Sequence, residues 1–87
     1  MTSPMQIQKL QWTPADGRAP RIITVTLRPP SPQGDTYAAE IDIAGFDEPC
    51  TKRIYGADAE QAVDLARKTV PALLELRAQG GSLTPID

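Results

Sequence analysis

Prolines and glycines divide the chain into short segments, and this division is the strongest constraint on its fold. The 87 residues include nine prolines and six glycines. Proline removes a backbone donor and fixes φ, while glycine favours turns, so both mark the ends of regular elements. Between them, apolar and polar residues alternate with the period of a half-buried strand. This pattern predicts strands at residues 5–12, 21–28, 36–43 and 50–55. The segment 29–35 contains three prolines, which exclude a central strand, and is predicted to be a loop.

A helical period replaces the alternation after residue 57. Asp58 is a typical N-cap, and Gln61 three residues later predicts a capping box in which its side chain bonds back to the Asp58 amide. Beyond this cap, apolar residues span an arc of roughly 200° on a helical wheel. They are Ala59, Ala62, Val63, Leu65, Ala66, Val70, Leu73, Leu74 and Leu76.

One proline and two glycines govern the rest of this helix. Pro71 lies on the polar side, where a missing hydrogen bond predicts a bend in a single helix, with a break into two helices as the alternative. Gly80 and Gly81 predict a left-handed end. Residues 80–87 are then expected to form a flexible C-terminal tail.

Together these patterns predict an α+β domain over residues 1–79. Its antiparallel sheet has about four strands, and one long C-terminal helix packs across one face in the order β-β-β-β-α. A chain of this length buries only about 60 to 65% of its unfolded surface. A protein partner or a second copy would therefore add materially to its stability.

Charge and hydropathy limit the classes of partner. Nine Lys and Arg against eleven Asp and Glu give a net charge of −2, and the basic residues are scattered, which disfavours nucleic acid. No apolar run approaches the ~20 residues that span a bilayer, and the N-terminus does not resemble a secretory signal. Cys50 is the single cysteine, as is typical of a reducing compartment. We expect a cytoplasmic protein that does not contact membranes.

Residue types also limit the chemistry. The sequence contains no histidine, which excludes Ser-His-Asp and Cys-His nucleophile systems and, with one cysteine, the familiar zinc sites within one chain. The glycine-rich motifs that bind nucleotide phosphates are also missing. We therefore expect a non-enzymatic protein without a cofactor.

Two groups of carboxylates are the candidates for acid chemistry. Asp47 and Glu48 fall in a predicted turn. Glu40 and Asp42 fall, together with Ala38, on the water-facing side of a predicted strand. Exposed carboxylates usually do no more than solvate a surface. We expect solvated side chains, with a hard-cation site as the alternative.

Cysteine and aromatic residues have a structural and a functional interpretation. Cys50 precedes Lys52 and Arg53, whose charges favour a reactive thiolate, but a free cysteine is more often a small buried apolar residue. Trp12 and Tyr55 could form an aromatic contact surface. We expect Trp12 and Tyr55 to fill the core instead, because the chain has only four aromatic residues.

The apolar arc of the helix is wider than packing on one sheet requires, which is little more than 100°. The surplus is chiefly Leu65, Ala72 and Leu76. These residues either pack beneath the N-terminal strand and the tail or meet a second chain. We expect a homodimer or a protein partner at this surface, since two-fold dimers are the commonest oligomers.

The chain resembles an uncharacterised family of small bacterial proteins, a domain of unknown function in which several strands precede a helix opening with Gly-x-Asp-x-x-Gln-Ala. The strand 37–46 fits this pattern, and the similarity covers residues 21–77. The matching helix residues are Gly56, Asp58, Gln61, Ala62, Leu65 and Ala66. The resemblance implies the fold and no activity.

A second, weaker likeness is to HicB-type antitoxin domains, in which a strand with Tyr-x-Ala and a turn with glycine precede a helix rich in Glu and Ala. Tyr37, Ala39, Gly45 and the segment 58–62 are similar to that pattern, although the turn 43–46 has no proline. This likeness implies an antitoxin or immunity-type protein as the alternative to a general interaction module.

Overall fold

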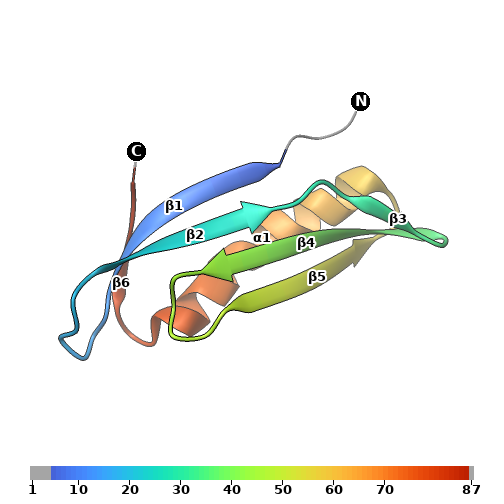
Figure 1. Ribbon diagram of the computed structural model, residues 1–87. Helices are drawn as coiled ribbons and strands as arrows, with labels where there is room; N and C mark the ends of the chain where they lie inside the picture. The colour runs from blue at the N-terminus through green and yellow to red at the C-terminus, as the bar shows by residue number, and fades with distance from the viewer. Residues whose placement is uncertain (1–4, 87) are drawn as a thin grey trace.

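The computed structural model describes residues 5–86 and shows one antiparallel sheet with a single helix across one face (Figure 1). The α+β class and the C-terminal position of the helix are as predicted. The elements in chain order are β1 (Gln6–Thr13), β2 (Arg21–Leu27), β3 (Ser31–Gln33), β4 (Thr36–Ala44), β5 (Cys50–Gly56), α1 (Ala59–Ala78) and β6 (Ser82–Pro85). The described residues therefore form six strands, where the sequence predicted about four.

The strand β4 is the centre of the sheet. It pairs with β3 and then with β2 along one side, and with β5 along the other. The register makes this clear, because Ile41 lies between Leu27 of β2 and Lys52 of β5. On the far side of β2 follow β1 and then β6. All pairs are antiparallel, so every side chain of the sheet belongs either to the helix-covered face or to the open face.

The first additional strand, β3, lies in the segment 29–35 that was predicted to be a loop. Ser31–Gln33 pairs with Thr36–Ala38 in a tight hairpin around Gly34, whose φ is 65°. The prolines exclude a central strand, as argued from the sequence, but Pro32 is compatible with an edge strand because its missing donor can face solvent. The loop prediction was therefore wrong for three residues.

The second additional strand, β6, lies in the segment predicted to be a flexible tail. Ser82–Pro85 pairs with Leu10–Thr13 of β1, and the Ile86 amide donates to the Lys9 carbonyl at 3.0 Å. Leu83 packs against the core. Gly81 permits this return, because a Cβ there would lie 2.5 Å from the Thr13 carbonyl oxygen.

The N-terminus of α1 is capped as predicted, with one difference. The Asp58 carboxylate accepts from the Gln61 amide at 2.8 Å. The Gln61 side chain in turn accepts from the Ala57 amide at 2.6 Å, and not from Asp58 as the capping box predicted. The box closes one residue earlier and still satisfies a free donor at the helix start.

The helix continues through Pro71 to Ala78 as one element, so the alternative of two helices was wrong. Pro71 is exposed on the flank of α1 that faces β1 and β6. The left-handed residues that end the helix are Gln79, with φ of 49°, and Gly80, with φ of 82°. Gly81 does not adopt this conformation. Among the described residues no helix is both long and apolar enough to cross a membrane.

The core lies between α1 and the sheet. Strand residues with period two meet alanines on the helix, whose small side chains allow α1 to lie close to β4 and β5. The buried set includes Ile23, Val25, Leu27, Ala39, Ile41, Ile43, Ala62, Ala66, Leu74 and Ala78. Ala38 was predicted to face water but is buried between its neighbours on β3 and β5, because its methyl group is shorter than theirs.

Candidate functional site

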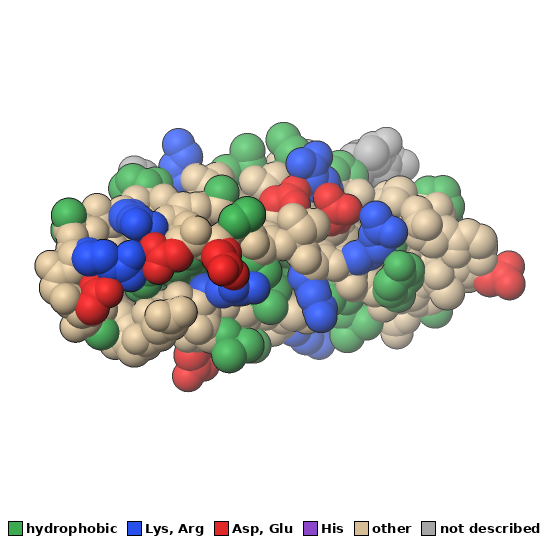
Figure 2. Space-filling view, turned by 60° about the horizontal axis from the view of Figure 1, so that its bottom comes forward, with side chains coloured by type: hydrophobic (Ala, Val, Ile, Leu, Met, Phe, Trp, Pro, Cys, Tyr) green, Lys and Arg blue, Asp and Glu red, His purple; other side chains and the backbone are tan. Residues whose placement is uncertain are grey.

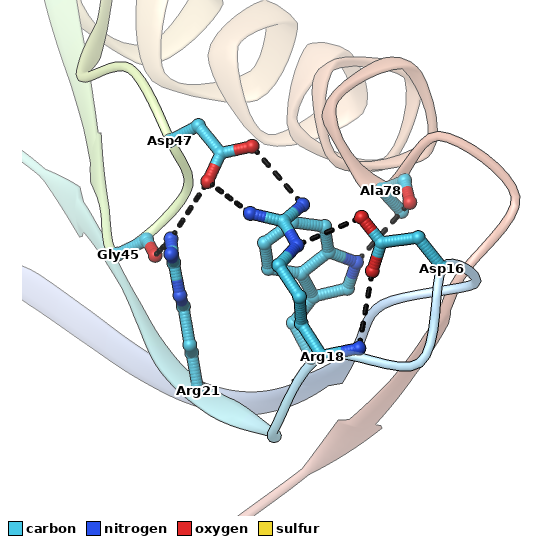
Figure 3. Close-up of polar contacts among 7 residues, drawn as sticks. Asp16, Arg18, Arg21, Gly45, Asp47 and Ala78 are labelled. Carbon is cyan, nitrogen blue, oxygen red and sulfur yellow. Dashed lines mark hydrogen bonds and ion pairs between the residues drawn. The ribbon is translucent and has the colours of Figure 1, made fainter.

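An ion cluster joins two loops at one end of the molecule (Figure 3). The Arg18 guanidinium donates to both carboxylate oxygens of Asp47, at 2.7 and 3.1 Å, and its Nε donates to Asp16 at 2.8 Å. Arg21 donates to Asp47 at 3.0 Å and to the Gly45 carbonyl at 3.3 Å. The cluster ties the loop between β1 and β2 to the loop between β4 and β5.

Trp12 lies beneath this cluster and is only 2% exposed. Its Nε1 donates to the Ala78 carbonyl at the end of α1 at 3.1 Å. Its ring packs edge-on against Phe46, with centroids 4.8 Å apart. The guanidinium carbons of Arg18 and Arg21 lie 5.5 and 5.8 Å from the ring centroid, within the range of cation–π attraction. Core filling by Trp12 is confirmed.

The charges of the ion cluster leave little scope for acid–base catalysis. Hydrogen bonds from Arg18 are the main cause that lowers the pKa of Asp47 below its ordinary value, and the Arg21 charge adds to this. The pKa of Arg18 is raised, chiefly by its bonds to Asp47. An arginine-paired carboxylate of low pKa is a poor general acid or base near neutral pH. The cluster therefore acts as a structural tie.

The carboxylates on the open face of the sheet are also paired. Asp42 accepts from Arg28 Nε at 2.6 Å and from the Thr51 hydroxyl at 2.9 Å. Glu40 lies 3.4 Å from Arg28 and 3.5 Å from Arg53. Both carboxylates are in contact with solvent, as the sequence predicted. Among residues 5–86 no group of three or more potential ligands has metal-site spacing.

Cys50 and Tyr55, two candidate site residues from the sequence, differ in burial. Cys50 is a buried free cysteine that packs in the core beside β4. Its neighbour Lys52 is exposed at the sheet edge. Tyr55 was predicted to fill the core but is 53% exposed, because the alternation of β5 turns it to the open face. The aromatic residues therefore do not form one contact surface.

Leu65, Ala72 and Leu76 are all exposed, and we call them the α1 stripe. Leu65 is 40% and Leu76 73% exposed. Their spacing of seven and four residues places them in one line along the helix, on the flank opposite to Arg67 and Pro71. Neither β1 nor β6 covers them, so the first alternative, packing beneath the N-terminal strand and the tail, was wrong.

The opposite flank of α1 borders two shallow apolar grooves that the sequence did not suggest. One has a volume of about 300 Å³ and lies between Val70 and Pro71 of the helix and Gln6 and Gln8 of β1. The other, about 590 Å³, runs from Pro71 to Leu83. None of the polar side chains in the described part of the chain is buried, so none converges on either groove from within the protein. A ligand pocket normally needs such groups for orientation.

The edge of β5 is the remaining unusual feature. In the described part of the chain, β5 pairs with β4 only, along all seven of its residues. The backbone donors and acceptors on its other side have no strand to bind. Lys52 and Arg53 lie in the middle of this edge.

Comparison with known proteins gives one match. No curated protein and no solved structure matches the chain. A family model described as a domain of unknown function, DUF6968, matches residues 8–85. The match includes α1 and all six strands apart from Gln6 and Ile7. The chain therefore belongs to the DUF6968 family, and the predicted membership of a family of unknown function is confirmed.

Proposed function

We propose that this protein is a non-enzymatic protein-interaction module that self-associates through the α1 stripe. The observation that carries the proposal is the exposure of Leu65 and Leu76 in one line on the helix. A line of apolar side chains on a helix gains free energy when a partner removes it from water, at roughly 25 cal/mol per Å² of apolar area.

The charges beside the α1 stripe suit a second copy of the chain. Lys68 and Glu75 lie on its solvent side, almost equidistant from its centre. Antiparallel packing of two stripes about a two-fold axis would bring Lys68 of each copy near Glu75 of the other. Within one chain Lys68 contacts Asp64 at 3.3 Å and leaves Glu75 without an ion pair among the described residues.

The non-enzymatic part of the proposal has separate support. The carboxylates that the sequence marked for acid chemistry, Asp42 and Asp47 above all, are neutralised by arginine partners. Without histidine the chain also lacks the commonest general base at neutral pH.

Sedimentation equilibrium over a wide micromolar range tests the self-association. We expect a monomer–dimer equilibrium that Leu76→Glu abolishes, because a carboxylate would be desolvated in the interface. The matched control is Ile22→Glu, the same change at an exposed residue of the open sheet face, which should leave the equilibrium unchanged. A wild-type chain that stays monomeric at high micromolar concentration would refute the proposal.

The alternative function is an antitoxin or immunity-type protein that occupies the surface of a toxin. The basic edge of β5 favours a different protein as partner, because like charges on two copies would oppose each other there. Co-expression with the product of the neighbouring gene tests this alternative. It requires that the neighbour arrests growth alone and that this chain restores growth; a harmless neighbour counts against it.

A further inference from the structure

The edge of β5 is the longest free edge of the sheet among the described residues. It has seven residues without proline. On the other side of the sheet, β6 has four residues including Pro85, and β3 has three including Pro32. A longer edge without proline offers more unpaired backbone groups, so β5 is best suited to receive another strand.

This edge is basic although the whole chain is acidic. Lys52 projects from β5 on the helix-covered side, and Arg53 projects on the open face. Lys52 forms no ion pair with the described residues, while Arg53 contacts Glu40 at 3.5 Å and remains 53% exposed. Figure 2 turns the β5 side of the sheet forward, and basic side chains lie across the middle of that view, with hydrophobic and acidic ones beside them.

A second copy of the chain is a poor match for this edge. Two β5 strands that pair antiparallel about a two-fold axis near their middle bring Lys52 and Arg53 close to the same residues of the other copy. Like charges facing across a strand pair destabilise it. The free edge therefore discriminates against self-pairing and against basic strands.

We propose that β5 accepts an extended acidic segment of a different protein as an additional antiparallel strand. The proposal rests on the proposed role as an interaction module and adds the chemistry of one partner. The backbone of the segment would bind the free edge, as in other cases of strand addition. Self-association through the α1 stripe uses the helix and requires no pairing of β5.

The register predicts which residues the segment carries. Residues opposite Lys52 and Arg53 lie on opposite faces of the new strand, so two adjacent acidic residues would meet both cations. The next position faces Ile54, which is half-buried beside α1, and an apolar residue is favoured there. The segment is therefore expected to contain two adjacent acidic residues next to an apolar residue.

Fluorescence anisotropy with labelled peptides tests the proposal. The probe is a heptapeptide of valine and threonine with two adjacent central glutamates, compared with the same peptide carrying lysines. We expect the glutamate peptide to bind at least about tenfold more tightly, since both charge pairs change sign. Added salt should reduce this difference, because the cations are exposed.

Charge reversal and backbone blocking identify the site of binding. Lys52→Glu should weaken the glutamate peptide about five- to tenfold and strengthen the lysine peptide. Lys9→Glu, the same change on β1 at the far side of β2, should affect neither. Methylation of alternate peptide nitrogens on the pairing side should abolish binding, because it removes the donors that strand addition needs.

Three outcomes would overturn the inference: equal binding of both peptides, equal effects of Lys52→Glu and Lys9→Glu, or undiminished binding of the methylated peptide. The inference is also overturned if Thr51→Pro dissociates the dimer and Leu76→Glu does not, because β5 of one copy would then pair with β5 of the other. Dimers that persist while no peptide binds would reject the acidic strand and leave the proposed function intact.

Discussion

The region around Trp12 and the surface along α1 and β5 differ in how far their side chains are paired or covered within the chain. Around Trp12, arginine and aspartate side chains from separate loops pair with one another and cover an aromatic ring. Along α1 and β5, by contrast, leucines are exposed and Lys52 has no counter-ion among the described residues. Polar groups that serve only the stability of a fold normally have hydrogen-bond partners within the same chain. The Trp12 region therefore stabilises the fold, whereas the described residues of the chain cover neither the α1 stripe nor the outer edge of β5.

The largest expected effect separates the two regions by stability. Trp12→Ala should lower the free energy of unfolding by about 3–5 kcal/mol, because it removes a buried ring and the bond to Ala78. Leu76→Ala should change it by no more than about 0.5 kcal/mol, since that side chain is mostly exposed. Urea denaturation at low protein concentration measures both. An equal loss of unfolding free energy in the two variants would contradict the distinction between a stabilising and an exposed region.

A smaller effect tests whether β6 belongs to the stable region. Leu83 is half-buried against the core, so Leu83→Ala should cost about 1–2 kcal/mol. Hydrogen exchange should show protected amides in β6 of the wild type and faster exchange in the variant. A wild-type segment that exchanges as fast as free peptide would place 82–85 outside the stable region.

The smallest expected effect concerns pH. Arg18 lowers the pKa of Asp47 in the folded state. The contribution of ionised Asp47 to stability is therefore present above the pKa of about 3.9 that it has in the unfolded chain. This contribution is lost as the pH falls through the lower pKa of Asp47 in the folded state. Trp12 fluorescence should report the loosened loops below about pH 4.

The Asp47→Asn variant should lack that transition, because it cannot accept the same charge-assisted bonds. Asp35→Asn is the matched control, since Asp35 lies in the exposed turn between β3 and β4. An identical acid transition in the Asp47→Asn variant would show that other carboxylates cause it.

Local patterns predicted the parts of the fold that depend on local physics. The alternation of residues 21–27 and the Asp58 cap are set by neighbours in sequence, and both were located correctly. The strand β6 depends instead on a partner some seventy residues earlier, and Leu83 in "SLTPID" was its only apolar signal facing the core. A four-residue strand is too short to have a recognisable period.

The part of the candidate site that lies on one helix was predictable, because its pattern is local in the sequence. The width of the apolar arc identified Leu65, Ala72 and Leu76 as surplus to the core, and all three are exposed. The pairing of Arg18 with Asp47 joins loops 29 residues apart, and nothing in either loop indicates the other. Tyr55 was misplaced because the prediction rested on the small number of aromatic residues, whereas the alternation of β5 places Ile54 against the core and turns Tyr55 to the open face.

The closure of β1 by β6 has a consequence for assembly. Open-ended filaments grow head to tail and need two different complementary edges on each molecule. Here one border of the sheet ends in a short strand that contains Pro85, and the other repels its own kind through Lys52 and Arg53. Both borders thus disfavour edge-to-edge polymerisation, and under the proposal above the β5 edge remains open to an acidic strand.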